Sequence, residues 1–150
     1  MTDEISALID AARVAARNAH APYSRFGVGA AVLLSDGSVI TGANFENASY
    51  GLSLCGETVA LAKANSEGRF REIVAIGVIG GALGEDGALS GSSVVRPCGR
   101  CRQILNEAAQ MGGCDIAVHC ASADGSVVET HLVSELLPHA FGPADLGLAP

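Results

Sequence analysis

Three cysteines and one glutamate have the types and spacing to do chemistry. Glu57 follows Cys55 by two residues, and Cys98 and Cys101 form a Cys-x-x-Cys pair directly after Pro97. Each cluster is expected to begin a helix, where free N–H groups and the positive end of the helix dipole favour thiolates. Cys98 and Cys101 would then lie on one helix face, and Cys55 from another helix would complete a three-sulfur site.

Three thiolates predict a catalytic zinc site, because structural zinc sites close with four protein ligands and catalytic sites keep one position for water. Zinc lowers the pKa of such a water towards about 7. Glu57 could take the proton from this water and pass it to a substrate. Cys114 and Cys120 belong to no ligand-spaced pair, so we expect them to be ordinary buried thiols.

Composition restricts the setting of this site. The chain has 150 residues, of which 49% are hydrophobic, enough for one domain over residues 1–150 with its own core. We expect no signal peptide and no membrane partner, and therefore a reduced, cytoplasmic protein whose cysteines bind metal rather than form disulfides. The formal net charge of -7 argues against a nucleic-acid partner.

Apolar periodicity and turn signals predict the order helix, two strands, helix, strand, helix, two strands. Helices are expected over residues 3–20, 54–64 and 97–111, with a helical turn at 134–137. Strands are expected over 27–34, 38–43, 73–79, 116–121 and 127–132, and the glycine-rich residues 80–93 are expected to be a loop. This alternation favours an α/β fold, a three-layer α-β-α sandwich with a mixed, about five-stranded sheet.

Cys-x-Glu followed much later by Pro-Cys-x-x-Cys resembles the signature of the zinc cytidine and deoxycytidylate deaminases. The resemblance is closest to the short-chain, Cys-ligated, homotetrameric cytidine deaminases, and it extends over nearly the whole chain. Residues 23–31 are similar to that family's first-strand motif and residues 44–51 to its ribose-binding segment. Residues 97–105 and 136–143 are similar to its later motifs.

The resemblance implies an activity and a cofactor. Cys55, Cys98 and Cys101 would hold one zinc ion per subunit, and Glu57 would be the catalytic residue. The enzyme would be a hydrolase acting on the C–N bond of a cyclic amidine, in which activated water replaces the amino group at C4 of free cytidine or deoxycytidine. Glu57 would protonate the ring nitrogen and then the departing ammonia. Uridine or deoxyuridine is the product, as in pyrimidine salvage.

The resemblance also assigns substrate contacts. Asn44 and Glu46, two apart in an extended segment, would point the same way and hold the ribose hydroxyls, while Phe26 would pack against the pyrimidine ring. The active sites would lie at the subunit contacts of a homotetramer. Further substrate-binding residues would be Phe45, the backbone N–H of Gly56, and Tyr50 and Phe141 from a neighbouring subunit.

One departure from the family pattern concerns charge. The common family sequence is Cys-Ala-Glu-Arg, and here Gly56 and Thr58 stand in place of the alanine and the arginine. Three thiolates and Zn²⁺ leave a net negative charge that a cation near a sulfur would offset. We expect Arg100 to replace the missing arginine, ahead of Arg102, and Gln103 to lie in the surroundings of the ligands. The alternative is that Arg100 is a solvated arginine at a helix start.

Parts of the sequence are compatible with three other functions. The Cys-Gly-Arg-Cys sequence also resembles blasticidin S deaminases, which act on a cytosine-nucleoside antibiotic, but these lack the Asn-x-Glu pair in the form seen here. A non-catalytic zinc-binding module would need a fourth protein ligand. A deaminase of bases in tRNA or DNA would share the zinc chemistry, but the acidic net charge and the Asn-x-Glu pair argue against it.

Overall fold

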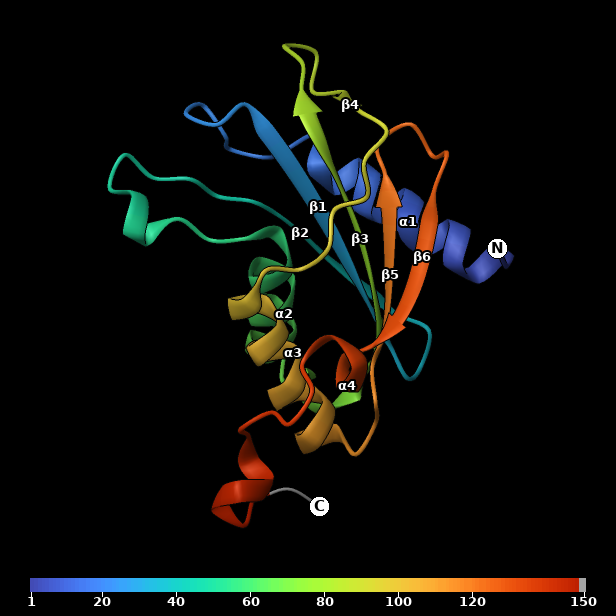
Figure 1. The fold of residues 1–150 in the computed structure, drawn as a ribbon, viewed down its shortest axis with the longest axis vertical. Coiled ribbons are helices and arrows are strands. Elements are labelled where there is room, and N and C mark those ends of the chain that lie inside the picture. Colours follow the sequence, from blue (N-terminus) through green and yellow to red (C-terminus); the bar gives the residue numbers. More distant parts are fainter. Residues whose placement is uncertain (149–150) are drawn as a thin grey trace.

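A mixed β-sheet lies between helices in this computed structural model, which describes residues 1–148 (Figure 1). The strand order is β2-β1-β3-β5-β6, with β4 paired to β3. β3 and β5 are parallel, and the other paired strands are antiparallel. The strands are β1 (Phe26–Leu34), β2 (Val39–Ala43), β3 (Ile73–Leu83), β4 (Leu89–Ser90), β5 (Ala117–Ser122) and β6 (Val128–Leu132).

Helices cover both faces of the sheet, which confirms the predicted three-layer α/β fold. α1 packs on one face, and α2 and α3 pack with α4 on the other (Figure 1). Within residues 1–148, no helix is both long and apolar enough to cross a membrane. The α-helices are α1 (Asp3–Ala16), α2 (Gly56–Ser66), α3 (Gly99–Gly112) and α4 (Val133–Leu136), and the 3-10 helices are η1 (Tyr50–Leu52), η2 (Phe70–Glu72) and η3 (Pro143–Leu146).

Alternating side chains of the sheet fill two apolar cores. On β1, Ala30 and Val32 face the α2–α3 side, and Ala31 faces α1. Small residues let the helices approach closely, because a Cβ atom at Gly42 of β2 would lie 2.5 Å from the backbone nitrogen of Ala60 in α2. This contact fixes the position of α2, and with it the residues at its N-terminus.

The sheet has six strands, one more than the sequence indicated. β3 continues beyond residue 79 to Leu83, because its last residues pair with the start of β1, as in Phe26 with Ala82. The chain then turns back, and β4 pairs with the end of β3. The expectation of a loop over residues 80–93 was therefore wrong, because the glycines there weaken the apolar pattern but leave the backbone free to pair.

The helices begin and end within a few residues of their expected limits. α1 ends at Ala16 rather than near residue 20, where His20 instead forms a bridge with Phe45. α2 begins at Gly56, because the backbone of Leu54 is paired with Phe45. α3 begins at Gly99 rather than at residue 97. These shifts place cysteines at the N-cap positions of α2 and α3.

We expect Gly29→Ala to destabilise the fold strongly. A Cβ atom at Gly29 would lie 1.8 Å from the carbonyl oxygen of Ala12, so α1 would have to move off the sheet. The free energy of unfolding, measured by urea denaturation and circular dichroism, should fall by about 3 kcal/mol or more. Gly51→Ala is the control, because nothing lies within 4 Å of its new Cβ. Equal stability of the two variants would contradict this packing.

Candidate metal centre and active site

The N-termini of α2 and α3 bring three cysteine sulfurs together. Cys55 is the N-cap of α2, Cys98 is the N-cap of α3, and Cys101 lies in the first turn of α3. The three Sγ atoms all lie within 4.8 Å of one another, and those of Cys55 and Cys98 are 3.6 Å apart. The predicted cluster of three sulfurs is therefore confirmed.

The spacing of these sulfurs fits zinc. Zn–S bonds of about 2.3 Å in a tetrahedron place two sulfurs about 3.8 Å apart, close to the Cys55–Cys98 distance. A disulfide would need about 2.05 Å, and all five cysteines, each within residues 1–148, are free. Cys114 and Cys120 are not members of the cluster. The site thus offers three sulfur ligands from the described residues.

Cys55 and Cys101 ionise differently, because they share a hydrogen bond. A hydrogen bond from the Cys101 thiol, joined by contacts with Cys98 and Arg100, lowers the pKa of Cys55 to about 5. The same hydrogen bond and burial raise the pKa of Cys101 well above its ordinary value. Opposite pKa shifts of this kind are expected when two sulfurs lie close enough together to bind one cation.

Glu57 lies in the first turn of α2 against the sulfur cluster. Its side chain is buried, with the residue 3% exposed. Burial is the main cause that raises the pKa of this carboxyl to about 7, and the nearby Cys55 sulfur raises it further. A carboxyl with this pKa can both accept and release a proton near neutral pH. Glu57 therefore has the environment of a proton carrier.

Two arginines near the cluster have different surroundings. Arg100 donates a hydrogen bond to the carbonyl oxygen of Ser53 at 2.9 Å and lies close enough to Cys55 to lower the pKa of its thiol. Arg102 instead binds the backbone carbonyls of Pro97 and Leu136, at 2.7 and 3.0 Å. Arg100 is thus the arginine whose charge acts on a cluster sulfur.

Thr58 is a site residue that the sequence reasoning missed. Its hydroxyl lies 3.2 Å from the sulfur of Cys101. The spacing of three residues from Cys55 places Thr58 on the same face of α2 as that sulfur, and so near the cluster, but it does not predict the contact with Cys101 on α3.

Asn44 and Glu46 both contact the segment that leads into β1. The Asn44 side chain accepts a hydrogen bond from the Val28 N–H and donates one to the Phe26 carbonyl, at 2.9 and 2.8 Å. The Glu46 carboxylate accepts hydrogen bonds from the N–H groups of Tyr23 and Ser24 and from the Ser24 hydroxyl. These contacts lower the pKa of Glu46, so it remains ionised.

The aromatic residues of the predicted site are exposed and lie on different segments. Phe26 is 41% exposed at the start of β1, and Phe45 is 54% exposed beside His20, with ring centroids 6.0 Å apart. Tyr50 and Phe141 are more exposed still, and the Tyr50 ring lies beside that of Tyr23, with ring centroids 5.9 Å apart. All four rings are therefore exposed in the single chain.

Phe141 is held at the backbone by amide side chains of α3. Gln103 and Asn106 donate to the Phe141 carbonyl oxygen at 2.7 and 3.3 Å, and Gln110 accepts from the Ala144 N–H at 2.8 Å. Gln103, which we expected in the surroundings of the zinc ligands, thus contacts the C-terminal segment. We call the side-chain amides of Gln103, Asn106 and Gln110 the α3 amide clasp.

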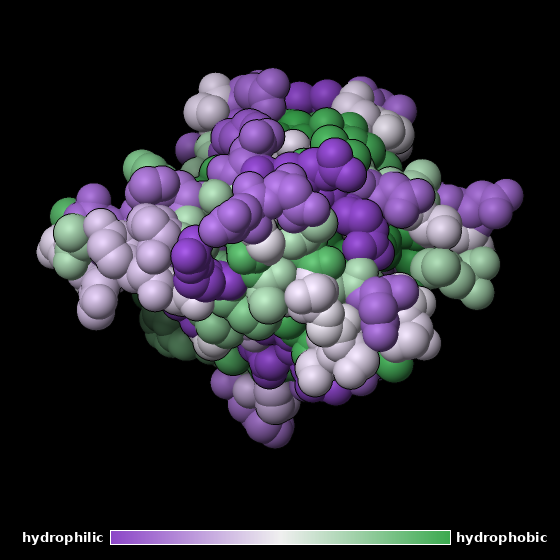
Figure 2. Space-filling model, turned by 90° about the horizontal axis from the view of Figure 1, so that it is seen from above, coloured by the Kyte–Doolittle hydropathy of each residue, from purple (hydrophilic) through white to green (hydrophobic). Residues whose placement is uncertain are grey.

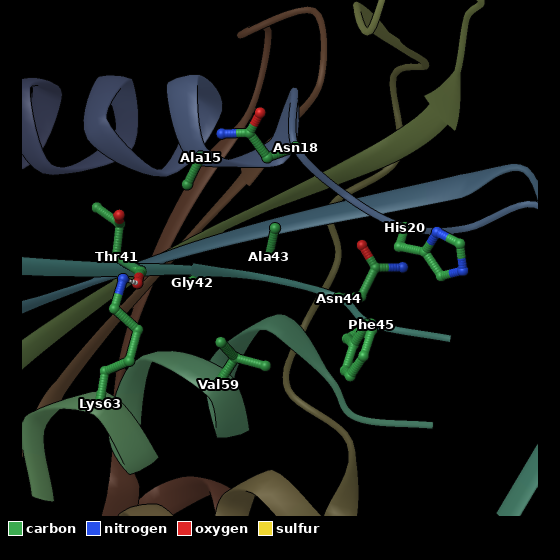
Figure 3. Close-up of a pocket in the computed structure, with 10 residues that line it drawn as sticks. All are labelled: Ala15, Asn18, His20, Thr41, Gly42, Ala43, Asn44, Phe45, Val59 and Lys63. Carbon is green, nitrogen blue, oxygen red and sulfur yellow. Dashed lines mark hydrogen bonds between the residues drawn. The ribbon is translucent and has the colours of Figure 1, made fainter. Parts of the chain in front are cut away.

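Two hollows lie near the predicted substrate residues. One has a volume of about 320 Å³ and is lined by Tyr23, Ser24, Glu46, Tyr50 and Ser53. Another of similar volume lies between the end of α1, β2 and α2, with Asn44 and Phe45 at one end and Lys63 at the other (Figure 3). The Lys63 ammonium there donates to the Thr41 carbonyl at 2.6 Å. The first hollow is lined by Glu46, a predicted ribose-binding residue. It is also lined by Ser53, whose backbone carbonyl accepts the hydrogen bond from Arg100.

Comparison with known proteins gives consistent results. The family model of the cytidine and deoxycytidylate deaminase zinc-binding region matches residues 2–112. A cytidine deaminase from Halalkalibacterium halodurans is 48% identical over 93% of this chain and 95% of its own length. One from Mycobacterium tuberculosis is 42% identical over 88% of this chain and 85% of its own length.

Solved structures agree with the sequence relatives. The crystal structure of cytidine deaminase from Burkholderia pseudomallei superposes with a TM-score of 0.77 at 39% identity, covering 94% of this chain and all of that one. That of Mycobacterium tuberculosis gives a TM-score of 0.71 at 39% identity, covering 95% and 99%. With its three-sulfur cluster and its buried glutamate, the chain belongs to the family of zinc-binding cytidine and deoxycytidylate deaminases.

Proposed function

We propose that this protein hydrolyses free cytidine and deoxycytidine to uridine and deoxyuridine, with release of ammonia. The observation that carries the proposal is the buried Glu57 beside a metal cluster of three sulfurs. A structural zinc module needs no proton carrier and needs a fourth protein ligand. Within residues 1–148, the cluster comprises Cys55, Cys98 and Cys101, which leaves a position for water.

Cys55, Cys98 and Cys101 would hold one zinc ion per subunit, which when bound supplies an acidified water for attack on C4 of the base. Glu57 takes a proton from this water and delivers it to N3 of the cytosine ring. The second water proton then passes through Glu57 to the departing amino group, and the C4–N bond breaks to release ammonia. A pKa of about 7 suits Glu57 to both transfers.

We assign ribose binding to Asn44 and Glu46, each with capacity left after its internal contacts. An amide nitrogen has two hydrogens, and the bond to the Phe26 carbonyl uses one. A carboxylate has about four acceptor positions, and the contacts with Tyr23 and Ser24 use three. The remaining N–H and acceptor position can bind ribose hydroxyls, which favours a free nucleoside.

We also assign the residues that would contact the pyrimidine base. Gly56 is the first residue of α2, where a backbone N–H has no carbonyl partner within the helix and can bind the base carbonyl. We place the pyrimidine ring against Phe26 and Phe45, which are partly exposed. A net charge of -7 supports a small nucleoside rather than a nucleic acid as substrate.

We further propose a homotetramer with its active sites at subunit contacts. Two segments project from the body in Figure 1, residues 44–54 and the C-terminal residues after α4. They expose Tyr50, Leu52 and Phe141 at 73%, 66% and 64%. Figure 2 shows the end of the molecule near β4, where hydrophilic and hydrophobic residues are mixed. Exposed apolar side chains on the projecting segments are typical of contacts between subunits.

The free cysteines of the cluster favour a reducing cellular compartment. Three free cysteines that must stay reduced to bind zinc suit the cytoplasm, where disulfides are rare. There the reaction would serve pyrimidine salvage. We also propose that residues 1–150 form one domain, since both apolar cores share the same sheet.

Metal content tests the ligand set. We expect the wild-type protein to bind about one zinc ion per chain, as three thiolates and a water allow. Cys98→Ser should lose most of this zinc, because a serine hydroxyl is a poor zinc ligand. Cys114→Ser should keep it, because Cys114 is outside the cluster. Mass spectrometry of metal content checks both variants, and a Cys98→Ser protein with full zinc would refute this ligand set.

Turnover tests the enzyme. The zinc-loaded protein should deaminate cytidine and deoxycytidine, followed as a loss of cytidine absorbance, and should leave single-stranded DNA unchanged. Glu57→Gln should lower kcat by about 10²-fold or more while its zinc content stays at the wild-type level. A zinc-loaded wild-type protein without cytidine turnover would defeat the proposal, and blasticidin S as a second substrate would then identify the antibiotic deaminase.

Arg100 is proposed to offset the charge of the thiolates through Cys55. Arg100→Ala should then lower kcat by about tenfold, the size seen when groups behind metal ligands are removed, with zinc retained. Arg17→Ala removes an exposed arginine beyond the end of α1 and should leave kcat unchanged. Full activity of Arg100→Ala would mean that Arg100 is a solvated surface arginine.

A further inference from the structure

The three sulfurs differ in how their negative charge can be stabilised. Cys98 is exposed, so water can reach its sulfur. Cys55 is half-buried at the N-terminus of α2 and lies near the Arg100 guanidinium. Cys101 is completely buried, with 0% exposure. A buried thiolate without a donor is costly, so the stabilisation of Cys101 has to come from inside the protein.

The Thr58 hydroxyl is the group that meets this need. Its Oγ1 lies 3.2 Å from the Cys101 sulfur, within hydrogen-bonding range for sulfur. A metal-bound cysteine has no thiol proton, so in the loaded site the threonine must be the donor and the sulfur the acceptor. The Glu57 carboxyl also lies beside Cys101, but in its ionised form it can only accept a hydrogen bond, whereas the Thr58 hydroxyl can donate one.

We propose that Thr58 is a positioning residue of the metal centre, whose hydroxyl donates to the Cys101 thiolate and tunes its charge. The inference rests on the proposed function for its effect on turnover, but not for its effect on the metal. A hydrogen bond draws electron density from the sulfur, which stabilises the thiolate and leaves the bound metal more positive. Both effects favour binding of metal at neutral pH and activation of water.

The hydrogen bond between Thr58 and Cys101 joins two different helices. Thr58 is in the first turn of α2 and Cys101 is in the first turn of α3. The hydrogen bond therefore joins the two helices that carry the ligands, 43 residues apart in sequence. A hydroxyl bound to a carbonyl of its own helix, the common arrangement for threonine, would provide no such link.

Thr58→Val and Thr58→Ser separate the hydrogen bond from simple packing. Valine has the shape of threonine without the hydroxyl, and serine keeps the hydroxyl but loses the methyl group. Zinc affinity, measured by competition with a chelator, should fall about tenfold or more in Thr58→Val and remain near the wild-type value in Thr58→Ser. The loss should be larger at lower pH, because protons compete with the metal for thiolates.

A spectroscopic signature tests the same bond independently of activity. With Co²⁺ in place of Zn²⁺, loss of the hydrogen bond raises the energy of the sulfur electrons. The sulfur-to-cobalt charge-transfer band of Thr58→Val should therefore move to longer wavelength, and that of Thr58→Ser should stay in place. A role in packing alone would leave the band of the isosteric valine variant unmoved.

Three outcomes are decisive. Unchanged affinity and an unchanged cobalt band in Thr58→Val would overturn the proposal. Equal losses in Thr58→Val and Thr58→Ser would also overturn it, because the methyl group rather than the hydroxyl would matter. A shifted band in Thr58→Val combined with no cytidine turnover by the wild-type protein would support the role of Thr58 and refute the proposed function.

Discussion

Negative charge buried between two helix N-termini is the constraint on which the site depends. Cys55 and Cys98 cap α2 and α3, where unpaired N–H groups favour anions, but the fully buried Cys101 and Glu57 need other partners. The Thr58 hydroxyl lies 3.2 Å from the Cys101 sulfur, and the Arg100 guanidinium lies near Cys55. The sheet contributes by holding α2 close, through backbone contact at Gly42, so that the sulfurs stay within range of one cation.

Much of this centre could be predicted from the sequence, because its ligands occur in short local motifs. Cys-x-Glu and Pro-Cys-x-x-Cys each place their residues within one helical turn, and the alternation of strands and helices predicted the layers. The contact of Thr58 with Cys101 could not be predicted, because it depends on how α2 packs against α3. The pairing of residues 80–83 with β1 depends on tertiary structure in the same way.

The side chains proposed to bind ribose also fix the backbone at the start of β1. Arg25 adopts a left-handed backbone conformation with φ of 59°, which is uncommon for a residue with a side chain. The side chains of Asn44 and Glu46 hold the residues on either side of it. Polar groups fixed in this way lose little further freedom when they bind, which favours selective recognition.

The α3 amide clasp joins the metal centre to the periphery. α3 carries Cys101 in its first turn, and its Gln103, Asn106 and Gln110 fix the backbone of residues 141–144. A side chain at Gly142 would displace these amides, since a Cβ would lie 2.6 Å from the Asn106 amide nitrogen. The backbone of Phe141 and the sulfur of Cys101 are thus positioned by the same helix, so a change in the orientation of α3 would displace both of them.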